Sequence, residues 1–404
     1  MSLHLTAEEE AMLGGQEGEG VALAMRVIVH SATISDAPRL VEITSAHVDS
    51  CLYHGQVSLD FAHRLVELGA KVRVPATLNV GSMDLIHPEL IRTKDTAGRE
   101  LMEAYVALGC TATFTCAPYQ LPNRPGLGEH VAWAESNAIV FANSVLGART
   151  DRYGDFLDIC AAITGRAPYS GLQTDEARRG TVAFDCRPLG SFLQSELVYP
   201  LLGHHIGSVV GGEIPVLVGI PGDVSEDSLK AFGAAAASAG GVALFHAVGV
   251  TPEAPTEVGE LPVRVVSRET LLAVRRSLST FTSGELDAVS VGTPHASYAE
   301  CVRLASLVDG LVLKVPFYLS TGRMTRARLE ESGVLRVLES AGVTVIVDTC
   351  TYVTSILAPG WKNVMTNSGK WAHYAPGNIN VSAVLGSLEE CVASARVGRV
   401  VLDA

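Results

Sequence analysis

Three cysteines stand where runs of buried-strand composition end, and thiolates at such places can hold a metal centre. Cys51 closes AHVDSC, Cys116 lies in TATFTCAPY and Cys350 closes VTVIVDTC. In open α/β sheets ligands bind outside the carboxyl ends of strands, and thiolates favour zinc or iron–sulfur clusters. The separations of 65 and 234 residues match no zinc-finger or ferredoxin pattern. Spacing therefore does not choose between these two kinds of metal centre.

The other five cysteines have placements typical of packed side chains. Cys160, Cys301 and Cys391 fall inside helical patterns, Cys110 ends a predicted helix, and Cys186 follows the apolar VAF. Free cysteine is among the most buried residue types, so we expect these five in the core. With no CxxC pair and no regular spacing, the cysteines predict no disulfide framework, which fits the cytoplasm.

Polar side chains near other strand and helix ends could bind and transform an acidic substrate. A guanidinium clamps a carboxylate bidentately and an ammonium supplies a point charge. The predicted catalytic residues are Ser136, Asn137, Arg149 and Lys370, and the predicted substrate-binding residues are Asn79, Ser82, Arg149 and Lys370. Each has an ordinary structural alternative, such as a helix C-terminal cap for Arg149 or a solvated position for Lys370.

Alternating strand and helix patterns must position these residues. Strand-like runs that pass into loops lie at 39–51, 71–84 and 111–119, helical spacing lies at 57–70 and 95–110, and an apolar helix is predicted over 128–150. The second half continues with strands at 287–293, 343–350 and 363–368 and a helix at 331–342. The pattern predicts several α/β domains with central sheets and an active site at the carboxyl ends of strands between domains.

Length and composition describe a globular chain of two or three domains. Its 404 residues are 48% hydrophobic, and a domain takes about 150 residues. We place one α/β region at 1–200 and a second at 201–404, with the border between 185 and 225. The net charge of −13 argues against a nucleic-acid partner.

The same composition predicts a soluble, cytoplasmic protein without a membrane anchor. The first residues carry no cationic and apolar export signal, and Thr6 with Glu9 predicts a capped helix. The most apolar run, 231–250, is interrupted by a glycine pair and contains His246. It therefore predicts an Ala-rich helix followed by a strand rather than a membrane span.

Several long strings closely resemble one family. They are AHVDSCLYHG, VRVPATLNVGSMDL, the run from FTCAPYQ to DICAAITGR, GTPHAS, VDTC and TNSGKWAHYAPG. They resemble the large subunit or large domain of aconitase X, a divergent branch of the aconitase superfamily, over about residues 5–400. The resemblance implies a dehydratase. Members act on cis-3-hydroxy-L-proline, giving Δ1-pyrroline-2-carboxylate, or on mevalonate 5-phosphate in archaea; DSCLYHG and Thr293 look like the bacterial hydroxyproline type.

The resemblance also implies an iron–sulfur cluster that acts as the Lewis acid. Cys116 and Cys350 fall on the family's cluster cysteines. Archaeal members have a Gly-Cys-Pro-His string where this chain has Thr293 in place of the cysteine. We therefore expect Cys51 as the third thiolate of a [2Fe-2S] centre, with His295 as the alternative third ligand.

The catalytic base is missing from these motifs. In aconitases it is a serine on a swivelling domain, which in this branch is a small subunit or a fused segment with a Gly/Ser-rich loop. No such loop occurs here, so we predict that this domain is absent from the chain and that a separate small subunit supplies the serine. Two interpretations from other classes stay open: a zinc hydrolase that uses Cys116, Cys350 and His295, and a non-catalytic scaffold subunit.

Overall fold

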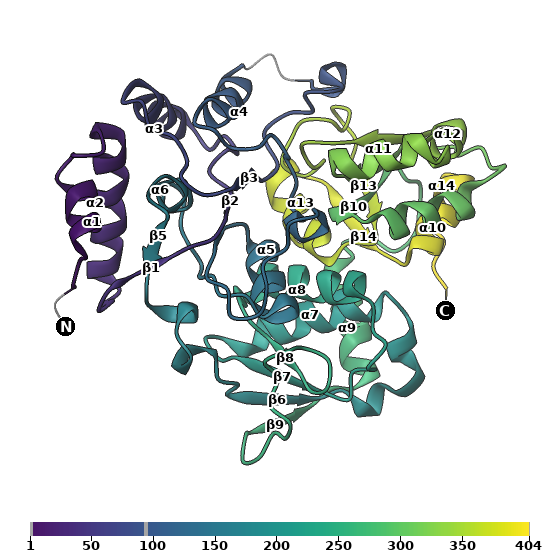
Figure 1. The fold of residues 1–404 in the computed structure, drawn as a ribbon. Coiled ribbons are helices and arrows are strands. Elements are labelled where there is room, and N and C mark those ends of the chain that lie inside the picture. Colours follow the sequence, from purple (N-terminus) through teal and green to yellow (C-terminus); the bar gives the residue numbers. More distant parts are fainter. Residues whose placement is uncertain (1–2, 93–95, 404) are drawn as a thin grey trace. The chain divides into compact units, whose positions relative to one another are not determined.

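Parallel strands joined by helices build both compact units of this chain (Figure 1). The computed structural model describes residues 3–92 and 96–403. Unit 1 comprises Met1–Ser82, Lys94–Arg179 and Thr251–Glu253. Unit 2 comprises Met83–Thr93, Gly180–Val250 and Ala254–Ala404. The predicted α/β class is confirmed.

Unit 1 is centred on a parallel sheet of three short strands in the order β3-β2-β4. A second, antiparallel pair joins β1 to β5. The strands are β1 (Leu40–Glu42), β2 (Ala46–Val48), β3 (Ala76–Leu78), β4 (Ala132–Trp133) and β5 (Arg166–Pro168). The α-helices are α1 (Ala7–Leu13), α2 (Glu19–Ile34), α3 (Gln56–Glu67), α4 (Ala97–Ala107), α5 (Ser136–Phe141) and α6 (Leu157–Thr164). Short 3₁₀ turns are η2 (Pro118–Gln120), η4 (Gly171–Gln173) and η5 (Glu176–Arg178), and η3 (Ala142–Leu146) is a π-helical turn.

Unit 2 contains two parallel sheets. The first has the order β8-β7-β6-β9 and the second the order β12-β11-β10-β13-β14. Their strands are β6 (Val182–Asp185), β7 (Pro215–Val218), β8 (His246–Ala247), β9 (Val263–Val265), β10 (Ala288–Ala296), β11 (Phe317–Thr321), β12 (Val343–Ile346), β13 (Asn363–Thr366) and β14 (Ser382–Leu385). The helices are η1 (Pro88–Leu90), η6 (Arg187–Gln194), α7 (Val198–Val210), α8 (Glu226–Gly240), α9 (Arg268–Leu278), α10 (Tyr298–Val308), α11 (Arg323–Glu331), α12 (Val334–Ser340), α13 (Gly369–Ile379) and α14 (Leu388–Val397).

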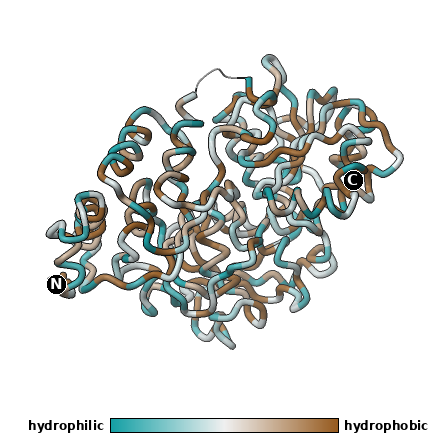
Figure 2. The backbone as a smooth tube through the Cα atoms, turned by 45° about the horizontal axis from the view of Figure 1, so that its top comes forward, coloured by the Kyte–Doolittle hydropathy of each residue, from teal (hydrophilic) through white to brown (hydrophobic). Residues whose placement is uncertain are grey.

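The five-stranded sheet is covered by helices on both faces. Apolar residues of α10, α11, α12 and α14 share one core with β10 to β14, while α9 and α13 also contact these strands. A parallel sheet buried on both faces needs strands that are apolar throughout, and β11 is buried along its whole length. Hydrophobic segments alternate with hydrophilic ones along the tube in Figure 2. No helix among the described residues is long and apolar enough to cross a membrane.

Two glycines one turn apart let α7 pack closely on α8. A Cβ at Gly203 would meet the carbonyl oxygen of Phe232 at 2.1 Å, and one at Gly207 would meet that of Ala236 at 2.4 Å. Both approaches are far below a normal contact, so only glycine fits. The Ala-rich helix followed by a strand, predicted over 231–250, is confirmed as the end of α8 and β8.

The structure contradicts two of the elements that were predicted from periodicity. The helix expected over 128–150 is a loop, the strand β4, the short helix α5 and the turn η3. Glu135 has φ +72° and breaks the run, while Ala132 pairs with Ala46 of β2. The strand expected over 111–119 is irregular: only Thr111 bridges Thr77, and Phe114 has φ +41°. Apolar runs in a buried sheet and in a buried helix look alike, so periodicity could not separate them.

Candidate metal centre and carboxyl-end site

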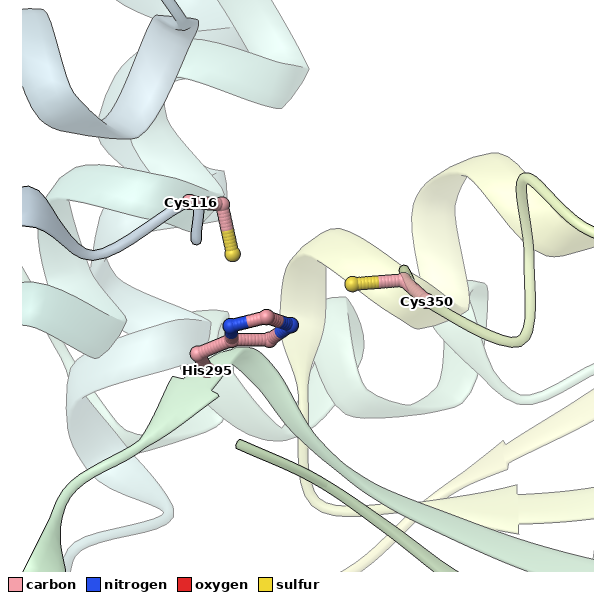
Figure 3. Close-up of side chains that lie close together, drawn as sticks. All are labelled: Cys116, His295 and Cys350. Atoms are coloured by element: carbon pink, nitrogen blue, oxygen red, sulfur yellow. The ribbon is translucent and has the colours of Figure 1, made fainter. Parts of the chain in front are cut away.

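His295 and Cys350 lie together at the carboxyl end of the five-stranded sheet in unit 2. His295 belongs to the end of β10, and Cys350 follows β12 in the loop through Asp348. Both side chains are buried, and a ring nitrogen of His295 lies within 4.8 Å of Sγ of Cys350 (Figure 3). An imidazole and a thiol facing each other are a donor set for zinc or for an iron–sulfur centre.

The proton on His295 is fixed by a backbone acceptor. Nε2 lies 3.2 Å from the carbonyl oxygen of Thr349. A carbonyl only accepts, so Nε2 carries the hydrogen and the lone pair of the neutral ring is on Nδ1. Metal-binding histidines characteristically donate their other N–H to a carbonyl or carboxylate in this way.

The loop that carries Cys350 is anchored by Asp348. Arg323 donates Nε to Oδ1 of Asp348 at 2.5 Å and Nη2 to Oδ2 at 2.7 Å, and the amide of Leu85 donates to Oδ2 at 3.1 Å. Burial outweighs these partners and raises the pKa of Asp348. Asp348 has φ +64°, an uncommon backbone conformation that these bonds hold in place. Sequence reasoning missed Asp348 and Arg323, because the pair is formed between distant segments.

Cys116 lies in unit 1 in an irregular segment pinned to the carboxyl end of β3. The amide of Thr115 donates to the carbonyl of Leu78 at 3.0 Å. Nδ2 of Asn137 donates to the carbonyl of Cys116 at 2.9 Å and to the hydroxyl of Tyr119 at 2.8 Å. Cys116 is buried. Asn137 therefore helps to set the position of the Cys116 backbone.

Cys51 also lies in unit 1, completely buried after β2. Its thiol donates to the carbonyl of Asn79, with Sγ 3.2 Å from the oxygen. Burial, together with the charges of Asp49 and Asp158, raises the pKa of Cys51 well above its usual value. The assignment of Cys51 as a ligand stays a prediction.

Polar residues follow all three strands of the parallel sheet in unit 1. Asp49 comes directly after β2, Asn79 directly after β3, and Glu135 two residues after β4. Nδ2 of Asn79 donates to Oδ1 of Asp49. Burial, and next the like charge of Glu135, raise the pKa of Asp49 to about 7. The sequence analysis gave a substrate-binding role to Asn79 and no role to either acid.

Glu135 and its neighbours begin helix α5. Its Oε2 accepts from the amide of Ala138 at 2.8 Å, and its Oε1 accepts from the hydroxyl of Ser136 at 3.1 Å. Ser82, at the other side of the sheet, accepts from the amide of Tyr53 at 3.0 Å. Both predicted serines thus take part in local hydrogen bonds.

The two predicted cations differ in their surroundings. Arg149 pairs with Asp175 and lies 3.7 Å from Oε1 of Glu253, and its side chain is 17% exposed. Lys370 lies in the first turn of α13, which Ser368 caps, and is 5% exposed. The positive end of a helix dipole adds to the charge of Lys370, and both favour an anion at this end of α13.

The chain matches three consecutive family models. They are described as aconitase X first domain (residues 2–176), second domain (180–275) and third domain (286–397). The chain is 40% identical to a cis-3-hydroxy-L-proline dehydratase of Pseudomonas aeruginosa over 98% of its own length and 70% of that protein. The chain belongs to the aconitase X family. The predicted resemblance is confirmed.

Other aconitase X relatives extend the comparison. A cis-3-hydroxy-L-proline dehydratase of Hypocrea jecorina is 41% identical, with 98% of this chain and 69% of that protein covered. A phosphomevalonate dehydratase large subunit of Methanocaldococcus jannaschii is 35% identical, with 96% and 99% covered. The crystal structure of Thermococcus kodakaraensis aconitase X in its holo form has a TM-score of 0.89 at 33% identity, covering 97% of this chain and all of that one. The named curated relatives are dehydratases, which are hydro-lyases.

Proposed function

We propose that this aconitase X chain removes water from cis-3-hydroxy-L-proline. The reaction takes the hydrogen from Cα and the hydroxyl from C3, and the resulting enamine tautomerises to Δ1-pyrroline-2-carboxylate. The observation that carries the proposal is the identity of 40 and 41% to two cis-3-hydroxy-L-proline dehydratases, against 34 to 37% to phosphomevalonate dehydratase large subunits. Mevalonate 5-phosphate is the second candidate substrate.

We propose further that Cys116, Cys350 and His295, the side chains drawn in Figure 3, hold an iron–sulfur cluster of the [2Fe-2S] type. Buried thiols and an imidazole whose proton is already held by Thr349 suit such a cluster. Cys51 is the alternative third ligand. When bound, the cluster supplies a Lewis acid for the departing hydroxyl.

The residues of the chain itself hold the substrate. We assign the carboxylate first to Lys370, because its charge and the N-terminus of α13 act together. Arg149, which already pairs with two acids, is assigned a supporting role. Asn79, Ser82, Ser136 and Asn137 are proposed to supply polar contacts that orient the ring.

A small subunit is proposed to complete the enzyme and to carry the catalytic base. Support comes from the archaeal relatives, which are named as large subunits and are covered almost completely by the match. The cis-3-hydroxy-L-proline dehydratases extend beyond the matched 69 to 70% of their length. A fused segment in those proteins and a separate subunit in the others would serve the same purpose.

The direct test is a dehydratase assay on the chain purified anaerobically with its small subunit, with the two substrates offered separately. Formation of Δ1-pyrroline-2-carboxylate from cis-3-hydroxy-L-proline alone supports the proposal. Turnover of mevalonate 5-phosphate alone would assign the second substrate instead. Lys370→Ala should lower kcat/KM by about a hundredfold or more, whereas the matched change Lys362→Ala, at an exposed lysine, should leave it unchanged.

A further inference from the structure

Asp49, Asn79 and Glu135 gather at one edge of the parallel sheet in unit 1, and we call them the carboxyl-edge group. Asp49 and Asn79 are the first residues after β2 and β3, and Glu135 follows β4. Because the three strands are parallel and paired in the order β3-β2-β4, these residues leave the sheet on the same side. The group shares unit 1 with Cys116, whose segment is bonded to the end of β3.

Hydrogen bonding within the group leaves one acceptor without a donor. Nδ2 of Asn79 donates to Asp49. A carboxylate oxygen only accepts, so the amide nitrogen must face Asp49, and the amide oxygen is the acceptor that remains. Oδ1 of Asn79 is buried and has no hydrogen-bond partner among the described residues, and the residue is only 2% exposed. A buried acceptor without a donor needs a physical explanation, and a donor supplied by a bound ligand is one.

Asp49 and Glu135 are the two acids of the group. Within the described part of the chain, no lysine or arginine forms an ion pair with Asp49, and the charged groups that act on it most strongly are Glu135, Asp158 and Asp155. Asp158 is fully buried and accepts from the amides of Asp49 and Ser50 at 2.6 and 3.0 Å. Asp49 itself is partly exposed.

Glu135 adds an uncommon backbone conformation to this edge. A glutamate with φ +72° is held only where its surroundings require it, and such residues cluster at functional sites. Here the conformation brings its carboxylate to the start of α5 and into the field of Asp49 and His47. The arrangement concentrates negative charge beside an unused acceptor.

We propose that the carboxyl-edge group binds the positively charged ring nitrogen of a cyclic amino acid. A secondary ammonium has two N–H hydrogens; one is assigned to the Asp49 carboxylate and the other to Oδ1 of Asn79, while Glu135 supplies a second negative charge. The inference rests on the proposed function and names the residues that select its substrate class. It also gives a reason for discrimination, because mevalonate 5-phosphate has no ammonium and its phosphate would be repelled by the two acids.

Two isosteric ligands isolate the contribution of the nitrogen. L-proline has the ring ammonium and the carboxylate, whereas cyclopentanecarboxylate keeps the ring and the carboxylate but has carbon in place of nitrogen. Titration calorimetry on the enzyme in its native assembly should give a dissociation constant at least tenfold lower for L-proline. Equal affinity of the unmodified enzyme for the two ligands would overturn the proposal without any variant being made.

The amide substitutions Asp49→Asn and Glu135→Gln remove charge and keep the acceptors that Asn79 and Ala138 use. We expect Asp49→Asn to raise the dissociation constant of L-proline at least tenfold and to leave that of cyclopentanecarboxylate nearly unchanged, with a smaller effect for Glu135→Gln. The matched control is Asp60→Asn, which removes an exposed charge from α3 in the same unit and should change neither constant more than twofold. An unchanged preference for L-proline in Asp49→Asn, with a native circular dichroism spectrum, would contradict the assignment.

The binding experiment and the dehydratase assay test the two proposals separately. If L-proline binds with the predicted dependence on Asp49 but cis-3-hydroxy-L-proline is not dehydrated, the proposed reaction is wrong and the ammonium site stands. If cis-3-hydroxy-L-proline is dehydrated but the nitrogen contributes nothing to binding, the ammonium site is wrong and the reaction stands.

Discussion

His295 donates from Nε2 to the carbonyl oxygen of Thr349, the residue that precedes Cys350, across a distance of 3.2 Å. The bond links the end of β10 to the loop after β12, and its carbonyl acceptor places the hydrogen on Nε2 of the ring. The bond therefore holds the side chain of His295 next to the loop that carries Cys350. The metal-binding proposal depends on this arrangement, and its parts can be tested separately.

Replacing His295 should weaken metal binding and leave the fold intact. His295→Gln keeps a polar side chain of similar reach but lacks the imidazole lone pair, and loss of a ligand or its orienting partner lowers metal affinity about tenfold to a hundredfold. Iron retained after dialysis against a chelator should fall accordingly, while thermal unfolding of the apoprotein stays near that of the wild type. Retention of iron at the wild-type level would favour Cys51 as the third ligand.

Arg323 should stabilise the loop that carries Cys350. The Arg323→Lys change removes the bidentate contact with Asp348, which is fully buried. A lysine cannot reproduce that contact. We expect the free energy of unfolding, measured with urea, to fall by about 1–3 kcal/mol. Arg326→Lys serves as the control, because Arg326 faces an exposed Glu330 at 3.5 Å, a type of pair that contributes about 0.3–0.5 kcal/mol.

His47 should make the fold sensitive to mild acid. Burial is the main cause that lowers its pKa from 6.5 to about 4, so the unfolded chain binds more protons than the folded chain between these two values. The stability contributed by the neutral ring is complete above pH 6.5 and is lost as pH falls toward 4. At about 1.36 kcal/mol per pKa unit, the loss is on the order of 3 kcal/mol.

The variant His47→Asn isolates this titration, because an asparagine can still bond Thr77, which now lies 2.8 Å from Nδ1. Urea unfolding at several pH values between 4 and 7.5 should show a flatter dependence than in the wild type. The same change at the exposed His63 should leave the dependence unaltered. A wild-type slope in His47→Asn would assign the acid sensitivity to other groups.

The sequence allowed prediction of the α/β class and of the strand ends where Cys350 and Asn79 lie. The fold class and the strand ends follow from the local sequence, because each apolar run ends where a loop begins. In a parallel sheet the polar residues of these loops then lie at one edge. Cys350 follows β12 and Asn79 follows β3 in the structure. The placement of these two residues therefore follows from the sequence.

Features formed between distant segments could not be predicted in this way. The strand at Ala132 exists because it pairs with Ala46, and its apolar neighbours look the same in a buried helix. The positive φ of Glu135 and the contact of Arg323 with Asp348 leave no local trace in the sequence. Asp49 gains its significance only from Asn79 and Glu135, which come from the two neighbouring strands.

The most direct test of the central claim is the iron and acid-labile sulfide content of the anaerobically purified protein. Wild type should be compared with Cys116→Ala and Cys350→Ala, and with Cys301→Ala as a control at a buried cysteine of α10. We predict about two iron and two sulfide per chain for a [2Fe-2S] centre, lost in the first two variants and kept in the third. Zinc without sulfide, or an active complex that retains its iron in both variants, would contradict it and favour the hydrolase or scaffold interpretation.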